Sequence, residues 1–330
     1  MRAYERLLNY VVVRTPSDEH STTSPSSQCQ FDLARILADE MTALGISDVS
    51  LDEFCYVYGK IPATPGYENK PSIGFIAHMD TVSDYCDHDI IPVVHKNYDG
   101  GDLPLGTSGR TLTVKAFPHL PSLAGRTLIT TDGTTVLGAD DKAGVAEIMT
   151  MAEALFKENI PHGPISIAFT PDEEVGGGTD HFNVEKFGAQ FAYTLDGDTE
   201  GEIQYENFHA CKADFEITGF AVHPGSSKDT MINACLVAAE INNMLPGLEI
   251  PRETEDYEGF YHLTGMSGDV AKAELHYIVR DHDKNLFEAR KETLRHIEKT
   301  LNEKWGDGTV KLTITDQYQN MAEIIAGCMH

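Results

Sequence analysis

Residues 165–178 read ISIAFTPDEEVGGG, and this stretch decides the fold class. Its first six residues are an apolar run typical of a buried strand in an α/β sheet, and three acidic residues and three glycines follow closely. Two other apolar runs also end in acidic residues, PSIGFIAHMD at 71–80 and FAYTLD at 191–196, and the second of these is likewise typical of a buried strand. Ligand sites in open α/β sheets gather at the carboxyl ends of strands, so this recurrence predicts a site at that edge.

The remaining pattern predicts two domains. In the first part of the chain we expect a hairpin around Asp132–Gly133 and a helix over 141–159. After about residue 205 the expected elements follow the order strand, helix, strand, strand, helix, strand, which is that of a ferredoxin-like βαββαβ unit. We therefore expect a first domain of residues 1–207 and 319–330, and a second domain of residues 208–318 that is inserted into the first or appended to its end.

Composition excludes several classes of function. The 330 residues suffice for about two domains, and 25 Lys+Arg against 52 Asp+Glu leave a formal net charge of -27. Such a surface repels phosphate backbones and anionic headgroups, so we expect neither a nucleic acid nor a membrane as partner. The sequence shows no signal-peptide pattern and no apolar run of about 18 residues. Its six cysteines are scattered, so a cytoplasmic protein with reduced thiols is expected.

Two short motifs bring ionisable side chains together. In His78-Met79-Asp80 the first and last side chains share a face of a strand, so Asp80 can orient the His78 imidazole; a purely structural His–Asp pair is an equal alternative. In GADDK (138–142) two adjacent carboxylates lie at the start of the expected helix. Capping of that helix by Asp141 would explain one of these acids but not both.

The acids at 172–174 suggest a bound cation, because three neighbouring carboxylates repel one another unless positive charge compensates them. A solvated acidic loop is the alternative for any single one of them. A phosphate site is a poorer interpretation, because the loop lacks the GxxxxGK[ST] pattern and would surround the anion with negative charge. Imidazole and carboxylate ligands without thiolates suit a pair of zinc ions or a related divalent metal. Glu173 and Glu174 could supply a base and a ligand side by side.

These motifs are together similar to those of a known family. HMDTV (78–82), GADDKAG (138–144), TPDEEVGGG (170–178) and TLDGD (194–198) resemble, in this order, the peptidase T family of co-catalytic zinc exopeptidases. HPGSSKDTMINA (223–234) and the strand around Arg280 resemble its inserted domain. The resemblance implies an α/β catalytic domain with a central mixed sheet flanked by helices, plus the ferredoxin-like domain. It further implies an aminopeptidase that removes the N-terminal residue from short peptides, preferentially tripeptides.

The resemblance also implies a role for each site residue. Two Zn²⁺ or other divalent ions are expected on His78, Asp140, Glu174 and Asp196, with Asp140 as the bridging ligand. For catalysis, Glu173 is expected to take a proton from a metal-bridging water so that the hydroxide attacks the peptide carbonyl, and Asp80 to orient His78. The Asp140–Asp141 peptide bond is expected to be cis.

In the inserted domain the resemblance implies that His223 polarises the scissile carbonyl and that Arg280 binds the carboxylate end of the substrate. Asn233 is a weaker candidate for substrate contact. Taken alone, His223 is more typical of a turn residue before Pro224-Gly225. The alternative for Arg280 is a surface ion pair with Asp281 or Asp283.

Alternatives also remain for the whole chain. One keeps the metal site and changes the substrate to an N-acyl amino acid or a longer peptide. The other is a catalytically silent fragment, because chains of the family continue past the inserted domain with a segment that brings a final histidine ligand. The sequence ends at residues 319–330, where that segment would begin, and His330 matches no ligand motif. The expected partners are a short peptide and, as an open option, a second copy of the chain.

Overall fold

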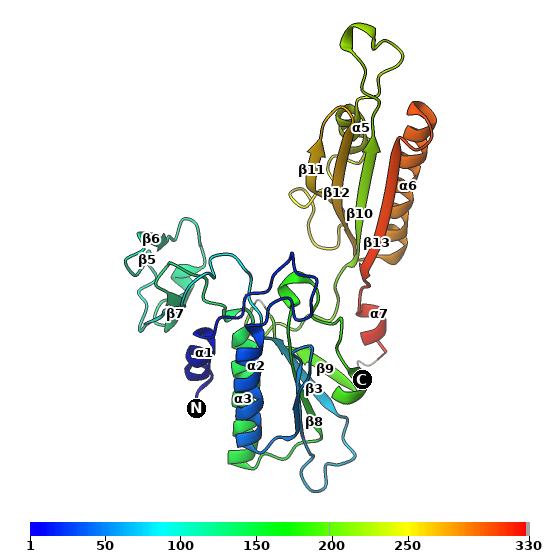
Figure 1. Cartoon of the computed structure of the whole chain (residues 1–330). Helices are drawn as coiled ribbons and strands as arrows, with labels where there is room; N and C mark the ends of the chain where they lie inside the picture. Colours follow the sequence, from blue (N-terminus) through cyan, green and yellow to red (C-terminus); the bar gives the residue numbers. More distant parts are fainter. Residues whose placement is uncertain (198, 328–330) are drawn as a thin grey trace. The chain divides into compact units, whose positions relative to one another are not determined.

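The computed structural model describes residues 1–197 and 199–327. The chain divides into two compact units, Met1–Glu200 and Gly201–His330 (Figure 1). Asp198 of the TLDGD motif and the terminal His330 lie outside the described residues. Within the described part of the chain, every helix is too short or too polar to cross a membrane.

A five-stranded mixed sheet forms the centre of the first unit, in the order β1-β2-β8-β3-β9. The strands are β1 (Ser47–Leu51), β2 (Val57–Ile61), β3 (Ile73–His78), β8 (Ile165–Thr170) and β9 (Phe191–Thr194). β3 runs parallel to both β8 and β9, whereas β2 is antiparallel to β1 and β8. The carboxyl ends of β3, β8 and β9 therefore meet at one edge of the sheet, as the sequence predicts.

The burial of these strands follows their place in the sheet. β8 is buried along its whole length, as its apolar run predicts, because a strand lies on each side of it and helices cover the sheet. The prediction that Phe191–Thr194 forms a strand is confirmed, but its predicted burial is wrong. β9 lies at the edge of the sheet and all four of its residues are exposed.

Helices α2 (Gln30–Leu44) and α3 (Ala139–Glu158) run side by side along the sheet (Figure 1). One buried core joins both helices to the sheet. It contains Leu33, Leu37 and Met41 of α2, Val145, Ile148 and Met149 of α3, and strand residues such as Ile167. α1 (Ala3–Val11) packs on α3, and the short α4 (Val184–Phe187) contacts β2 and β8. The helix predicted over 141–159 is confirmed, and its core contacts fix α3 against β3.

Between β3 and α3 the chain forms two small ribbons and a short 3₁₀ helix, η1 (Leu120–Leu123). β4 (Pro92–His95) pairs with β7 (Leu128–Thr131), and β5 (Leu103–Leu105) with β6 (Arg110–Leu112). The hairpin predicted around Asp132–Gly133 is wrong, because β7 pairs with β4 and no strand follows the turn. The Asp132 carboxylate accepts hydrogen bonds from Thr134, and the Val136 amide donates to the Tyr85 carbonyl, which draws the chain toward the segment after β3.

The second unit is a four-stranded antiparallel sheet in the order β11-β12-β10-β13, with two helices on one face. Its elements are β10 (His209–Thr218), α5 (Ala234–Met244), β11 (Phe260–Gly268), β12 (Lys272–Asp281), α6 (Lys284–Trp305) and β13 (Val310–Tyr318). This order confirms the predicted ferredoxin-like βαββαβ unit. Residues 322–325 add a short helix, α7 (Ala322–Ile325).

Candidate metal centre

His78, the last residue of β3, lies at the centre of the acidic cluster. Its side chain is only 2% exposed. The Nε2 atom is 2.9 Å from Oδ1 of Asp140, 3.8 Å from Oδ2 of Asp196 and 3.9 Å from Oε2 of Glu173. These carboxylates come from the start of α3 and from the segments after β9 and β8. The sequence predicts that these strand ends form one site, and their acidic side chains do lie around one imidazole.

Two sets of donor atoms are close enough to hold a cation. His78, Glu173 and Asp196 form one set, and His78, Asp140 and Glu174 form the other; within each set the ligand atoms lie within 4.8 Å of one another. Imidazole nitrogen and carboxylate oxygen are ligands that zinc and related divalent ions accept. The residues present therefore fit a divalent metal centre, with one imidazole common to both sets.

The carboxylates of the centre destabilise one another's charge. Burial raises the pKa of Glu173, Glu174 and Asp196, and repulsion from Asp140 acts in the same direction on all three. The nearby His78 opposes the rise in each case. Negative charge is thus in excess at this edge of the sheet, and a bound cation would relieve it.

The protonation of His78 reflects the same excess. Burial alone would lower the pKa of the imidazole, but the carboxylates of Asp80, Asp141 and Asp196 outweigh burial and raise this pKa to about 10. A cation that binds at Nε2 must therefore displace a proton from the ring. Proton release and metal binding are linked at this residue.

Asp80 connects His78 to the loop after β8. Its fully buried carboxylate has Oδ1 3.3 Å from Nδ1 of His78, and its main-chain oxygen is 3.0 Å from the same nitrogen. The two carboxylate oxygens also accept the backbone N–H groups of Glu173 and Glu174, at 3.0 and 3.1 Å. Asp80 therefore contacts the imidazole, as the sequence predicts, and also fixes the loop that carries both glutamates.

The two acidic side chains of the GADDK motif lie in different environments. The Asp140–Asp141 peptide bond is cis, which confirms the prediction. The buried Asp141 carboxylate accepts the backbone N–H groups of Gly144 and His78, at 3.0 and 3.2 Å. The Asp140 side chain is 72% exposed and faces His78. The backbone of α3 is kinked at Asp140 and Asp141, and the Asp141 carboxylate caps the helical segment that follows the kink, which leaves Asp140 for the centre.

The three acidic side chains after β8 also lie in two different environments. Glu173 and Glu174, in the 3₁₀ helix η2 (Glu173–Val175), reach the centre. The Asp172 carboxylate is buried instead against Ser26 and Gln30, near the start of α2. Sequence reasoning missed Ser26 and Gln30, because a polar side chain about 140 residues away carries no local signal for such a contact.

Lys142 is a further residue that sequence reasoning passed over. Its side chain is fully buried two residues after Asp140, and Nζ donates a hydrogen bond of 2.7 Å to the Val13 carbonyl. Burial lowers the pKa of Lys142 to about 8. Its place directly after two adjacent acids was the signal that could have identified it.

The three candidate substrate residues belong to the second unit. His223 is exposed, and its Nδ1 accepts the backbone N–H of Gly225 at 3.1 Å, as the turn interpretation predicts. Asn233 caps α5, and its side chain accepts from the amides of the next turn. The turn and cap roles are local, and neither conflicts with a second role toward substrate.

Arg280 does not form the surface ion pair considered from the sequence. Asp281 pairs with Arg290, and Asp283 caps α6. The Arg280 guanidinium lies over the Tyr318 ring, 5.3 Å from its centroid, and donates to the main-chain oxygens of Cys211 and Val279. Without a carboxylate partner in the described part of the chain, its charge is available to an anionic ligand.

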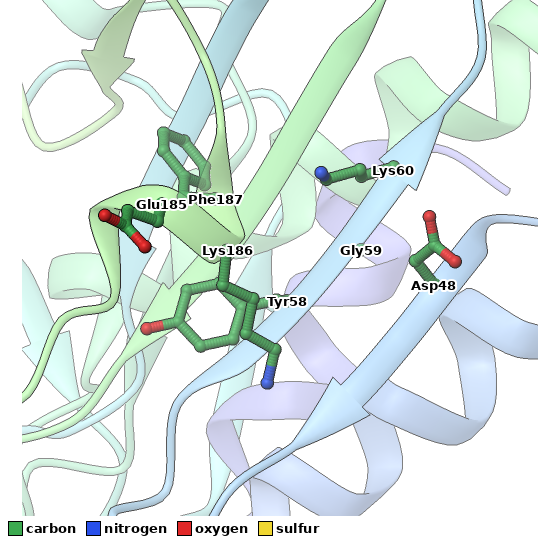
Figure 2. A pocket seen from close by; sticks show the side chains of 7 residues that line it. All are labelled: Asp48, Tyr58, Gly59, Lys60, Glu185, Lys186 and Phe187. Atoms are coloured by element: carbon green, nitrogen blue, oxygen red, sulfur yellow. The ribbon is translucent and has the colours of Figure 1, made fainter.

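A separate pocket lies on β2 and α4 (Figure 2). It is lined by Asp48, Tyr58, Gly59, Lys60, Glu185, Lys186 and Phe187. Lys60 pairs with Ser166 near the start of β8, whereas the acidic loop follows Thr170 at the end of that strand. This pocket is therefore distinct from the metal centre.

Comparison with known proteins points to one family. Residues 205–309 match the family described as peptidase dimerisation domain. Peptidase T of Clostridium perfringens is 51% identical over 330 residues, covering 100% of this chain and 81% of the relative. Peptidase T of Caldanaerobacter subterraneus subsp. tengcongensis is 50% identical over 331 residues, again covering 100% and 81%.

Solved structures share the fold. Aminopeptidase PepT from Bacillus cereus has a TM-score of 0.73 at 23% identity, over 97% of this chain and 76% of that chain. A tripeptidase from Staphylococcus aureus has a TM-score of 0.73 at 22% identity, over the same shares of 97% and 76%. The mixed sheet with its helices and the ferredoxin-like unit therefore form a fold found in known peptidases.

Proposed function

The chain belongs to the peptidase T family of metal-dependent tripeptide aminopeptidases, and we propose that the acidic cluster around His78 is the site where it removes the N-terminal residue of a short peptide. The observation that carries this assignment is the pair of donor sets that share His78, one of which includes the carboxylate of Glu173. This arrangement supports the proposal of a metal centre and a base at one sheet edge, which is what hydrolysis of a peptide bond requires.

In this proposal, His78, Asp140, Glu174 and Asp196 would hold two divalent ions, and Asp140 would be the ligand common to both. Zinc suits the donor set of one imidazole and several carboxylates without thiolate. When bound, such ions polarise the scissile carbonyl and make a water molecule nucleophilic at neutral pH. Burial and, after it, repulsion from Asp140 raise the pKa of Glu174 and Asp196, and a bound cation would relieve the excess of negative charge.

Glu173 serves as the general base. Its side chain is 53% exposed, so it can reach a water molecule, while its backbone is held by Asp80. Burial raises the pKa of its carboxyl group toward the range in which a base works well near neutral pH. The carboxylate accepts a proton from the attacking water and returns it to the leaving amine.

Two residues of the second unit act on the substrate. Since Nδ1 of His223 accepts the Gly225 N–H, the neutral ring carries its proton on Nε2. A donor at Nε2 suits the oxyanion that develops on the scissile carbonyl. Arg280 offers a planar fork to the carboxylate end of the peptide. Among the described residues, the side-chain NH₂ group of Asn233 donates no hydrogen bond, so it is open to a weaker substrate contact.

The decisive experiment replaces the base. With Glu173→Gln we expect turnover of a tripeptide to fall by about 10²–10⁴-fold, the usual contribution of a general base. Zinc content, measured by elemental analysis, should stay close to that of the unmodified chain. Glu185→Gln, an exposed acid on α4, is the matched control and should retain full activity. Near-normal turnover by Glu173→Gln would disprove the assignment of the base.

The substrate class needs a separate test. A panel of tripeptides with free amino termini and their N-acetylated counterparts distinguishes an aminopeptidase from a hydrolase of N-acyl amino acids. We expect cleavage of the free peptides only. Preferential cleavage of acylated substrates would favour the alternative of an N-acyl amino acid hydrolase on the same metal centre.

The proposed assembly is a homodimer formed through the inserted domain, residues 208–318. The segment that matches the dimerisation-domain family includes β11, an edge strand, and an edge strand is a template for pairing with another chain. Leu236 on α5 is 67% exposed in the same segment. Light scattering coupled to size-exclusion chromatography tests this, and a monomer at micromolar concentration would contradict it.

A cytoplasmic location is part of the same proposal. The five cysteines among the described residues are all free, which suits a reducing compartment. Fractionation of cells that express the chain would test this, and recovery outside the cytoplasm would contradict it.

A further inference from the structure

Asp172 and Gln30 form a reciprocal contact next to the centre. Nε2 of Gln30 donates to Oδ1 of Asp172 at 2.6 Å, and the Asp172 backbone N–H donates to Oε1 of Gln30 at 3.2 Å. Gln30 is 0% exposed and Asp172 is 4% exposed. One side chain at the start of α2 thus holds both the carboxylate and the main chain of the residue before Glu173.

Ser26 completes the set of partners. Its backbone N–H donates to Oδ2 of Asp172 at 2.7 Å, and its hydroxyl donates to Oδ1 at 2.5 Å. Among the described residues Asp172 has no ion pair with a lysine, arginine or histidine. A buried carboxylate without a cation is costly unless donors surround it, so these three hydrogen bonds stabilise the buried Asp172 carboxylate.

The backbone at Asp172 adds a second constraint. Its φ is +56°, in the left-handed region that non-glycine residues seldom adopt. Its carbonyl accepts the Gly177 N–H at 2.8 Å, which closes the loop. On the other side, the amides of Glu173 and Glu174 donate to Asp80. The loop is therefore held from two directions, by Asp80 and by the segment 26–30.

We propose that Asp172 is a positioning residue for the reaction: with Gln30 and Ser26 it fixes the backbone that presents Glu173 as the base and Glu174 as a metal ligand. This inference rests on the proposed roles of those two glutamates. A displacement of about 1 Å in a catalytic group can reduce the rate about 10²-fold. Loss of the hydrogen bonds between Asp172 and residues 26 and 30 is therefore expected to lower the rate of the reaction and the metal affinity of the folded protein.

The test exchanges the hydrogen-bond donor and acceptor between residues 30 and 172. In Asp172→Asn, an amide N–H faces a donor from Ser26 or Gln30. In Gln30→Glu, a carboxylate faces the Asp172 carboxylate. When both changes are combined, the new carboxylate at position 30 accepts from the new amide at position 172 and from the main-chain N–H there. Each single variant should lose function, and the double variant should recover most of it.

Two readouts are measured on each variant. At saturating zinc, we expect kcat for a tripeptide to fall about ten- to hundredfold in each single variant with KM little changed. Zinc affinity, measured by competition with a chelator, should fall about ten- to hundredfold as well. Asp180→Asn, an exposed acid in the same loop, is the matched control and should leave both unchanged. The folded fraction, from circular dichroism, corrects for loss of stability.

The outcomes separate the two proposals. If both single variants keep normal kcat and zinc affinity per folded molecule, or if the double variant recovers neither, the positioning role is wrong. If the unmodified chain binds zinc but does not cleave tripeptides, the proposed function fails. The zinc affinities of the same four proteins then still decide whether Asp172 positions the loop.

Discussion

The Asp80 carboxylate accepts the backbone N–H of Glu173 at 3.0 Å, so a buried acid at the end of one strand fixes the candidate base that follows another. The same carboxylate lies 3.3 Å from Nδ1 of His78. The imidazole and the base therefore share one support. A change at Asp80 is expected to disturb both at once.

Asp80→Asn tests this shared support. An amide in place of the carboxylate must turn its NH₂ group toward a backbone N–H or toward the imidazole, so at least one hydrogen bond is lost. We expect zinc affinity and tripeptide turnover each to fall about ten- to hundredfold, as for other groups that orient metal ligands. Chelator competition and steady-state kinetics measure them. Asp84→Asn, exposed in the segment after β3, is the control; an unaffected Asp80→Asn enzyme would contradict the role.

Metal affinity should rise with pH. In the metal-free centre the surrounding carboxylates raise the pKa of His78 to about 10, so the ring is protonated at neutral pH. Binding at Nε2 releases that proton, and the apparent affinity should increase about tenfold per pH unit for each proton released, up to about pH 10. Zinc titration against a chelator at pH 6.5, 7.5 and 8.5 measures the slope. An affinity independent of pH would show that His78 does not bind the metal.

The local parts of the centre could be predicted from the sequence. Apolar runs that end in acids placed His78, Glu173 and Asp196 at strand ends, and parallel pairing brought those ends together. The GADDK motif placed Asp140 at the start of a helix. The contact of Asp172 with Gln30 could not be predicted, because nothing near either residue specifies a partner across the fold.

At Asp132–Gly133, by contrast, the sequence predicted a strand pairing that the described part of the chain does not contain. The turn residues were recognised correctly, since Asp132 accepts hydrogen bonds from Thr134. The partner strand was not, because β7 pairs with β4, more than thirty residues earlier in the chain. A turn signal fixes local backbone geometry but leaves the strand pairing to tertiary contacts.

Gly144→Ala should destabilise the first unit although alanine favours helices. A Cβ at Gly144 would lie 2.0 Å from the Leu195 carbonyl oxygen and 2.5 Å from Oδ1 of Asp141. The segment before Asp196 must then move away from α3. We expect a loss of about 1–3 kcal/mol in the free energy of unfolding, together with weaker zinc binding. Urea titration measures the first. Gly247→Ala, which has open space around it, is the control; a stabilised Gly144→Ala protein would refute the close approach.

Lys142→Met should change how stability depends on pH. Burial lowers the pKa of Lys142 from 10.5 to about 8, so the unfolded chain binds this proton up to about pH 10.5 and the folded chain only to about pH 8. Between these values the unfolded state binds more protons, and the free energy of unfolding therefore rises with pH. Below about pH 8 the full cost of burying the charge is present. The variant lacks this group, so the unmodified protein should gain about 3 kcal/mol relative to it across that window.

Urea unfolding of both proteins at pH 7.5, 9 and 10, followed by circular dichroism, measures the difference. The single tryptophan, Trp305, reports the second unit separately by fluorescence. Lys96→Met, which removes an exposed ammonium, is the matched control. Because the comparison is a difference between two proteins, titration of the many other groups cancels. A difference that stays constant from pH 7.5 to 10 would mean that Lys142 keeps its proton when buried, and that its hydrogen bond to Val13 holds a charged ammonium throughout.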